Sequence, residues 1–253
     1  PDLDIHTSTQ MNILTTKGVL LAKERGAKRV VAAREMSIKE LSQVKKETGV
    51  EIETFVHGAM CLSYSGRCLM SSMAGGRSGN RGRCAQPCRH SYDGKYPLSM
   101  RDLCSVRYIP YLIEAGIDSL KIEGRMKNEY YTAATVEAYR SLVDDYMNGI
   151  FSEDKAYSTE KRLLDIFNRG GFSSGYMIRE RADISWDKEL IDDSMPGRRG
   201  VKAGEIVRTE KGKVYFKALI DIASGDELLI DTKTPISITS NTDIRSGTYD
   251  SLD

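Results

Sequence analysis

The sequence predicts an α/β fold: a TIM-barrel-like (β/α)8 domain without its first strands, followed by a small antiparallel β domain. Over about the first 150 residues, short apolar runs of strand type alternate with helical segments that end at glycine, which indicates a parallel sheet. Beyond Pro196, short alternating runs separated by turn residues indicate antiparallel strands. A length of 253 residues suits one large domain with a small appendage.

The first three strands and two helices follow from local signals. Ser37 and Glu40 have the spacing of a capping box, so a helix begins after Ser37, and Gly49 ends it. Gly26 ends the helix before it in the same way. We expect strands over Leu3–His6, Arg29–Ala33 and Glu51–Val56, and helices over Thr16–Arg25 and Ser37–Gly49.

The second half of this domain contains one weaker element. Tyr96–Met100 is a weak strand candidate, and a helix over Val106–Ala115 then ends at Gly116. The apolar run Ile117–Ile122 predicts the fifth strand. A long helix is expected over residues 128–148 because apolar and small residues recur there at helical spacing. These are Tyr131, Thr135, Ala138, Leu142 and Tyr146.

The rest of the chain divides into a connector and the β domain. The connector has a short helix over Thr159–Asn168 and a Gly-rich segment over Arg169–Tyr176. Turn signals at Glu210–Gly212 and Ser224–Asp226 predict two hairpins, and the tail from Thr232 is not expected to complete the β domain. The expected limits are residues 1–150 for the barrel-like domain, with a cysteine-rich loop at 57–95, then 151–194 for the connector and 195–253 for the β domain.

Polar side chains come just after each predicted strand. In a (β/α)8 barrel such positions share the C-terminal face, where active sites lie. Any one of them is more often a helix cap or a salt-bridged loop residue, but five groups in succession favour a common site. No Gly-rich phosphate turn follows a strand, so a dinucleotide-binding fold has no support, and a complete barrel would require strands upstream of Pro1. The groups are His6 with Ser8 and Gln10, Arg34 with Glu35, His57, Arg101 with Asp102, and Glu123 with Arg125.

Four of the five cysteines lie in the loop at residues 57–95, with the spacing C-x6-C-x15-C-x3-C. Residues 71–83 are mostly Gly, Ser, Arg and Asn, which cannot form an apolar core around four buried thiols. A metal centre therefore explains the loop best. Structural zinc sites generally use two tight Cys pairs, and only one pair here is tight, so the spacing favours an iron–sulfur cluster. The four are Cys61, Cys68, Cys84 and Cys88.

The fifth cysteine, Cys104, leaves the ligand set open. It comes just past a predicted strand end, on the face where the loop is expected, and would there replace Cys88 as the fourth ligand. A lone Cys at a helix start is, however, more often a small core residue. An odd number of cysteines and the absence of a secretory signal favour a reducing compartment, so we expect a cytoplasmic location.

The cysteine loop is strongly basic, although the whole chain carries a net charge of only +1. From Arg67 to Arg101 there are seven cationic side chains and one acid, Asp93. A solvated face, or compensation for the negative charge of a cluster, would explain this excess. So would a site for an anionic substrate or a nucleic-acid backbone. No stretch of about 18 apolar residues exists, so no membrane span is expected.

A long motif surrounds the first two cysteines: Glu53-x-Phe55-x2-Gly58-Ala59-Met60-Cys61-x4-Gly66-x-Cys68-x-Met70-Ser71. It resembles, without mismatch, the signature of the collagenase-like peptidase family U32. The resemblance covers about residues 1–176, and the β tail is similar to the family's small C-terminal domain. Further blocks that resemble the family are Ser8-Thr9-Gln10, Arg34-Glu35, Asn80-Arg81-Gly82, Cys88-Arg89, Asp102-Leu103-Cys104 and Lys121-Ile122-Glu123-Gly124-Arg125.

The family name implies proteolysis, but the better understood members imply oxygen-independent hydroxylation with a [4Fe–4S] cluster. Those members act on tRNA uridine, ribosomal RNA cytidine or ubiquinone precursors, with prephenate as the proposed hydroxyl donor. The resemblance also implies the barrel fold and makes Cys61, Cys68 and Cys84 cluster ligands, with Cys88 or Cys104 as the fourth. We therefore expect an RNA hydroxylase most similar to the tRNA branch, because the loop is compact.

On this interpretation the candidate catalytic residues are His57, Glu123 and Arg125. Arg125 also has an ordinary alternative, which is a salt bridge to Glu123 or Glu129. Arginine suits carboxylates because its planar fork binds them through two hydrogen bonds. We expect Arg67, Arg81, Arg89 and Arg125 to bind a prephenate-like dianion and RNA phosphates.

A peptidase is the main alternative. Cys61 or Cys68 would then pair with His57 as nucleophile and base, or Ser63 or Ser65 would be the nucleophile. That interpretation leaves the other cysteines without a role. A subunit of a ubiquinone-pathway hydroxylase is a further alternative, and a homodimer or a heterodimer is compatible with either hydroxylase.

Overall fold

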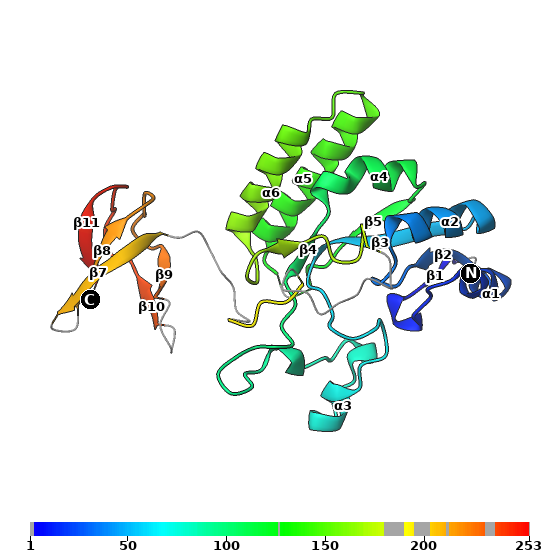
Figure 1. The fold of residues 1–253 in the computed structure, drawn as a ribbon, viewed down its shortest axis with the longest axis horizontal. Coiled ribbons are helices and arrows are strands. Elements are labelled where there is room, and N and C mark those ends of the chain that lie inside the picture. The colour runs from blue at the N-terminus through cyan, green and yellow to red at the C-terminus, as the bar shows by residue number, and fades with distance from the viewer. Residues whose placement is uncertain are drawn as a thin grey trace. The chain divides into compact units, whose positions relative to one another are not determined.

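Strands and helices alternate through the N-terminal part of the chain, as the sequence predicts (Figure 1). The computed structural model describes residues 3–125, 127–179, 190–194, 203–210, 213–230 and 236–252. The chain forms two compact units, Pro1–Arg199 and Gly200–Asp253. Each unit has its own sheets and its own apolar core.

The first unit has a sheet with a parallel centre, in which β1 pairs with β2, β2 with β3, and β3 with β5. Parallel neighbours need crossover connections, and helices are present between the strands. The strands are β1 (Ile5–Thr7), β2 (Ala27–Val31), β3 (Glu51–Gly58) and β5 (Ser119–Ile122), and the helices are α1 (Thr16–Glu24), α2 (Ile38–Thr48), α4 (Ile109–Glu114) and α5 (Glu129–Met147). This confirms an α/β domain with a parallel sheet. In the residues described, β1 pairs only with β2 and β5 only with β3, so closure into a barrel stays a prediction.

The capping box predicted for α2 is present. The Ser37 hydroxyl accepts a hydrogen bond from the Glu40 amide at 3.3 Å, and the Ser37 amide donates to the Glu40 carboxylate at 2.9 Å. Gly49 ends the helix with φ of 63°, in the left-handed region that favours glycine. Local sequence chemistry therefore determines both ends of this helix.

The strand expected over Tyr96–Met100 is wrong. Pro97 has no amide hydrogen for a strand ladder, and the Ser99 amide instead closes a turn onto the Tyr96 carbonyl at 2.9 Å. The strand here is β4 (Asp102–Cys104), which runs antiparallel to the end of β3 and pairs in parallel with β6 (Phe172–Ser173). The sheet of the first unit is therefore mixed at the end where β3 leads into the cysteine loop.

The connector helix is longer than expected. It is α6 (Glu153–Ile166), and it begins six residues before Thr159 because Ser152 caps it by accepting a hydrogen bond from the Lys155 amide. Acidic residues in its first turn also favour the helix start. Together α4, α5 and α6 bury a large apolar cluster that includes Leu112, Leu142 and Leu163.

A second cluster lies under α1 and α2. It includes Val19, Leu41 and Ile52, each at most 1% exposed. Apolar packing on the helix-covered side thus holds the parallel strands. The C-terminal ends of these strands are left to meet the cysteine loop.

The loop that follows β3 has little regular structure. It contains one short helix, α3 (Met70–Gly75), and two 3-10 turns, Gly79–Arg81 and Pro87–Arg89. Figure 1 shows α3, drawn in cyan, well separated from α4, α5 and α6. Apolar burial holds only its beginning, where Met60 and Leu62 pack on the core cluster, since Leu69 and Met73 are 61% and 84% exposed.

The second unit is antiparallel, as predicted. β7 (Gly204–Glu210) and β8 (Lys213–Ala218) form a hairpin whose last pair is Glu210 with Lys213, while residues 211 and 212 lie outside the described residues. β11 (Tyr249–Leu252) pairs with the other edge of β8. β9 (Glu227–Ile230) and β10 (Ile236–Thr239) form a separate antiparallel pair.

One expectation about this unit is wrong, and whether the tail completes the β domain stays a prediction. The turn at Ser224–Asp226 is present, but β9 after it pairs with β10 and not with β8, so it does not form the expected hairpin. The tail from Thr232 does contribute to the unit, because it supplies β10 and β11. Both strands are only four residues long and pair with distant segments, which leaves little local signal.

None of the helices in the described residues has the length and the apolar character that a membrane span needs.

Candidate functional site

The cysteine loop lies against the residues that follow the parallel strands. Gly66 packs so closely on the backbone after β1 that a Cβ would lie 2.0 Å from the Gln10 carbonyl oxygen. Arg125, which follows β5, lies beside Gly82 of the loop: a Cβ on Gly82 would be 3.1 Å from a nitrogen of the Arg125 guanidinium. The structure therefore brings residues after β1 and β5 to the same loop, on the face where the sequence predicts a common site.

Glu35, which follows β2, holds the segment between the first two loop cysteines. Its carboxylate accepts hydrogen bonds from the Ser65 amide at 2.5 Å and from the Ser65 hydroxyl at 3.1 Å. The Ser65 hydroxyl also accepts a hydrogen bond from the Arg34 amide at 3.3 Å. Glu35 and Ser65 are both buried, and charge-assisted hydrogen bonds of this kind are strong. Ser65, a nucleophile in the peptidase alternative, thus bonds to a carboxylate and not to an imidazole.

All five cysteines are free thiols. Among the described residues, no group of three or more His, Cys, Asp or Glu side chains is arranged closely enough to hold a metal ion. The four loop thiols nevertheless influence one another. Burial raises the pKa of Cys88, and Cys61, Cys84 and Cys68 each raise that pKa further.

Two backbone amides donate hydrogen bonds to loop sulfurs. The Gln86 amide donates to the Cys84 sulfur at 3.3 Å. Burial raises the pKa of Cys61, whereas a hydrogen bond from the Ser63 backbone lowers it. Such N–H···S contacts stabilise thiolates, and thiolates are the form in which cysteine binds metals.

Cys104 lies apart from the loop cysteines. It is 3% exposed, on β4 opposite His57, inside the core cluster under α4, α5 and α6. Its pKa is raised to about 12, mainly by burial and in small part by the charge of Glu160, against the lowering effect of hydrogen bonds from Val106 and Tyr139. None of the groups that shift the pKa of this thiol is a loop cysteine.

The candidate substrate-binding arginines divide into two kinds. Arg67 and Arg81 are exposed on the loop, and Arg125 is exposed after β5. Arg89 is partly buried and uses its guanidinium within the protein, donating to the Ser99 hydroxyl at 2.7 Å, the Met100 carbonyl at 2.5 Å and the Met60 carbonyl at 3.3 Å. The structure thus gives Arg89 a role in joining the loop to the strand ends.

The ordinary alternative for Arg125 is not seen. Among the ion pairs of the described residues, Glu123 pairs with Arg34 at 3.6 Å, and neither Glu123 nor Glu129 pairs with the Arg125 guanidinium. Only the Arg125 backbone amide bonds to Glu123, at 3.2 Å. The Arg125 guanidinium is therefore directed toward the loop, beside Gly82, and remains available to an anion.

His57 lies in an aromatic environment. Its ring is 2% exposed, with ring centres at 5.3 Å for Phe172, 5.6 Å for Tyr139 and 5.9 Å for Tyr131. Its Nδ1 lies 3.4 Å from the Tyr139 hydroxyl. Burial, together with the positive charge of Lys127, lowers the pKa of His57 to about 3, so the ring is neutral at physiological pH. A catalytic role for His57 stays a prediction, and its contacts here are those of a packed core residue.

A buried acid–arginine pair was not anticipated. Arg169 donates to one Asp102 oxygen at 2.9 Å, and Asp102 is 1% exposed. The other Asp102 oxygen and the Arg101 Nε are buried without a hydrogen-bond partner. Arg169 is 67 residues from Asp102, so no local pattern relates them. The only signal in the sequence is the Gly-rich segment after Arg169, because glycine allows two backbones to approach closely.

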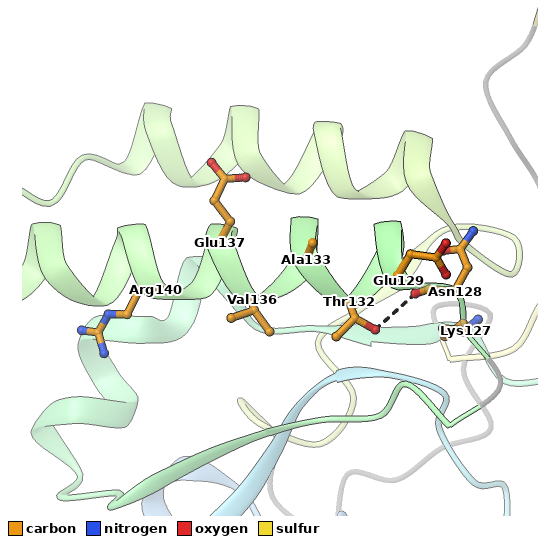
Figure 2. A pocket seen from close by; sticks show the side chains of 8 residues that line it. All are labelled: Lys127, Asn128, Glu129, Thr132, Ala133, Val136, Glu137 and Arg140. Atoms are coloured by element: carbon orange, nitrogen blue, oxygen red, sulfur yellow. Dashed lines mark hydrogen bonds between the residues drawn. The ribbon is translucent and has the colours of Figure 1, made fainter.

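A shallow groove of about 720 Å³ lies elsewhere, along α5 (Figure 2). Figure 2 shows that its lining comes from one side of this helix and the residues just before it. No loop cysteine contributes to it, so the groove has no evident part in the site. Its lining residues are Lys127, Asn128, Glu129, Thr132, Ala133, Val136, Glu137 and Arg140.

Comparison with known proteins gives a family match and several relatives. Residues 1–187 match the model of peptidase family U32. The chain is 43% identical to tRNA hydroxylation protein P1 of Bacillus subtilis over 163 residues, which is 58% of this chain and 39% of that protein. It is 34% identical to an uncharacterized protease of Methanocaldococcus jannaschii over 259 residues, 92% of this chain and 61% of the relative. It is 36% identical to tRNA hydroxylation protein P of Helicobacter pylori over 218 residues, 76% of this chain and 51% of the relative.

The chain thus spans between 39% and 61% of the length of these relatives. No solved structure matches it significantly.

Proposed function

The chain belongs to peptidase family U32, and on that premise we propose that it takes part in the hydroxylation of tRNA, with uridine as the modified base. The observation that carries this proposal is its similarity to two proteins named for tRNA hydroxylation, at 43% and 36% identity. The exposed cations of the cysteine loop support it, because binding of a nucleic-acid backbone depends on Lys and Arg. A tRNA substrate would place the reaction in the cytoplasm.

We propose that the loop cysteines hold a [4Fe–4S] cluster. Cys61, Cys68, Cys84 and Cys88 fit this role because four thiolates suit such a cluster, and backbone amides donate to the sulfurs of Cys61 and Cys84, as is usual for metal-bound sulfur. Cys88 is the better fourth ligand, since Cys104 lies in the apolar core. When bound, the cluster would supply electron transfer and activation of the oxygen donor.

The protein's own part in the reaction is to bind and orient anions. Arg67, Arg81 and Arg125 are exposed around the loop, where they would hold RNA phosphates and a prephenate-like dianion. Arg89 would act by holding the loop against Met60 and Met100, so that these cations keep their positions.

The peptidase alternative has one observation in its favour, the similarity to a protein named as an uncharacterized protease. Two features of the structure disfavour it. The His57 ring bonds to Tyr139 and is closed off from solvent, and Ser65 is buried against Glu35. A general base must lie within reach of the proton that it removes. The enclosed His57 ring does not reach a substrate in solvent, and the Ser65 hydroxyl has no imidazole beside it in the described part of the chain.

The test uses the full-length protein purified without oxygen. We expect about four irons and matching sulfide per chain, lost in Cys68→Ser and Cys88→Ser and retained in the control Cys104→Ser. Nucleosides of tRNA from cells lacking the protein should regain the hydroxylated uridine with wild type and Cys104→Ser, but not with Cys68→Ser. Stoichiometric zinc without sulfide would contradict the cluster. Unchanged nucleosides with wild type, together with cleavage of a gelatin substrate, would favour the peptidase.

A further inference from the structure

Arg34, just after β2, holds a positive charge inside the protein next to the cysteine loop. Its side chain is 13% exposed. The guanidinium carbon lies 3.8 Å from the centre of the Phe55 ring, and the Arg34 amide bonds to Ser65 in the loop. Stacking on one side and the loop on the other restrict the movement of this side chain.

The hydrogen bonding of Arg34 is incomplete. Its Nε is buried and has no acceptor, and such buried donors are rare in native proteins. Its ion pair with Glu123, at 3.6 Å, uses another nitrogen of the guanidinium. One N–H of a buried cation is therefore available for an acceptor beyond those it contacts in this structure.

The acceptor can be sought near Cys61. The Arg34 amide donates to the Ser65 hydroxyl at 3.3 Å, and Ser65 is only four residues along the loop from Cys61. The segment that carries Cys61 is held by Glu35 through Ser65, immediately beside Arg34 in the sequence. The cation and the sulfur ligand are thus fixed by the same contacts.

Resting on the cluster that we propose above, we infer that Arg34 is a positioning residue that raises the reduction potential of the metal centre. It does so through its fixed positive charge and through an N–H···S hydrogen bond from its free Nε to a sulfur at the Cys61 side. Glu123 opposes this effect, because its carboxylate lies against the same guanidinium. Together these two side chains set the potential at which the centre accepts an electron.

The physical basis is the charge of the two redox states. In the measured step, one electron from dithionite converts [4Fe–4S]2+ to [4Fe–4S]+, so the reduced centre is more negative. A nearby cation stabilises it, and hydrogen bonds to sulfur act in the same direction. A buried charge is screened far less than the exposed arginines of the loop. Arg34 should therefore outweigh any single exposed arginine.

The experiment is an anaerobic titration of the full-length protein with dithionite, followed by absorbance and electron paramagnetic resonance. At the wild-type midpoint, Arg34→Gln should lower the ratio of reduced to oxidised cluster about tenfold, which is about 59 mV for one electron. Arg34→Lys, which keeps the charge, should lower the ratio less. Glu123→Gln should raise it. The matched control is Lys95→Gln, which removes a loop cation whose side chain is 74% exposed and should leave the ratio within about twofold.

Electrostatic tuning predicts that Arg34→Gln and Glu123→Gln change the ratio of reduced to oxidised cluster in opposite directions. Simple damage to the loop would change it in the same direction in both variants. If Arg34→Gln fails to retain iron, the test uses Arg34→Lys and Glu123→Gln, each with a wild-type iron content. The first should lower the ratio of reduced to oxidised cluster, and the second should raise it. A lowered or unchanged ratio in Glu123→Gln, or an Arg34→Gln ratio equal to that of Lys95→Gln, overturns the inference and leaves the proposed function standing. Wild type without iron and sulfide overturns the proposed function itself.

Discussion

The cysteine loop and the sheet beneath it are held by different forces. The sheet and its helices bury wholly inaccessible apolar side chains such as Val30 and Leu142. Beyond Leu62, the loop exposes large apolar residues such as Leu69 and Met73, and it is held by a few polar contacts and by close backbone approaches at Gly58 and Gly66. Apolar burial is spread over many residues, whereas the order of the loop depends on a small number of groups. The framework should therefore tolerate damage to the loop, while the site should not.

Cysteine reactivity gives the largest contrast between the two regions. Cys104 belongs to the framework, and burial raises its pKa from the usual 9.0 to about 12. Because its folded pKa is raised, at pH 8 it should have roughly a thousandfold less thiolate than an ordinary cysteine, and it should gain reactivity only as the pH approaches 12.

Mass spectrometry after brief iodoacetamide treatment of the metal-free protein at pH 8 checks this prediction. Cys84, which is exposed on the loop, serves as the internal control and should be alkylated. Alkylation of Cys104 at a rate comparable to Cys84 would mean that the core around β4 opens readily.

A core truncation tests the framework itself. Leu142→Ala removes a side chain with no solvent exposure from the cluster under α5, and it should lower the free energy of unfolding by about 2–5 kcal/mol. Urea denaturation followed by circular dichroism measures the change. The matched loop variant is Leu69→Ala, at a residue 61% exposed, which should change stability by no more than about 0.5 kcal/mol. Equal losses from both variants would show that the loop is part of the same cooperative core.

A glycine substitution tests the loop. Gly66→Ala places a Cβ 2.0 Å from the Gln10 carbonyl oxygen at a φ of 74°, so the loop must move away from β1. A forced overlap of this kind costs about 1–3 kcal/mol, which corresponds to roughly a 5- to 150-fold loss of the docked loop. Hydrogen exchange should report faster exchange at the Ser65 amide, with core amides of β3 unchanged.

Gly75→Ala is the control for this variant. Gly75 lies in the same loop, but its φ is not positive and nothing lies within 4 Å of the added Cβ. Normal protection of Ser65 in Gly66→Ala, or equal loss of protection in both variants, would contradict the account of how the loop is docked.

Local sequence patterns determined most of the framework. The capping box at Ser37 and the left-handed Gly49 are interactions within a few residues, and the spacing of Tyr131, Ala138 and Leu142 is a property of one helix. The family motif around Cys61 and Cys68 likewise lies in continuous sequence and led to the same family as the comparisons.

Tertiary structure decided what depends on distant segments. Asp102 meets Arg169 across 67 residues, and β11 pairs with β8 only after the chain has passed through β9 and β10. Burial also separated residues that look alike in the sequence: Cys104 is enclosed in the core while Cys88 stays with the loop. Nothing in the sequence distinguishes Arg34 from the other arginines, and it is packing on Phe55 in the folded protein that encloses its charge. The physical reason is that burial and pairing depend on which surfaces meet after folding, whereas capping and periodicity depend only on near neighbours in the chain.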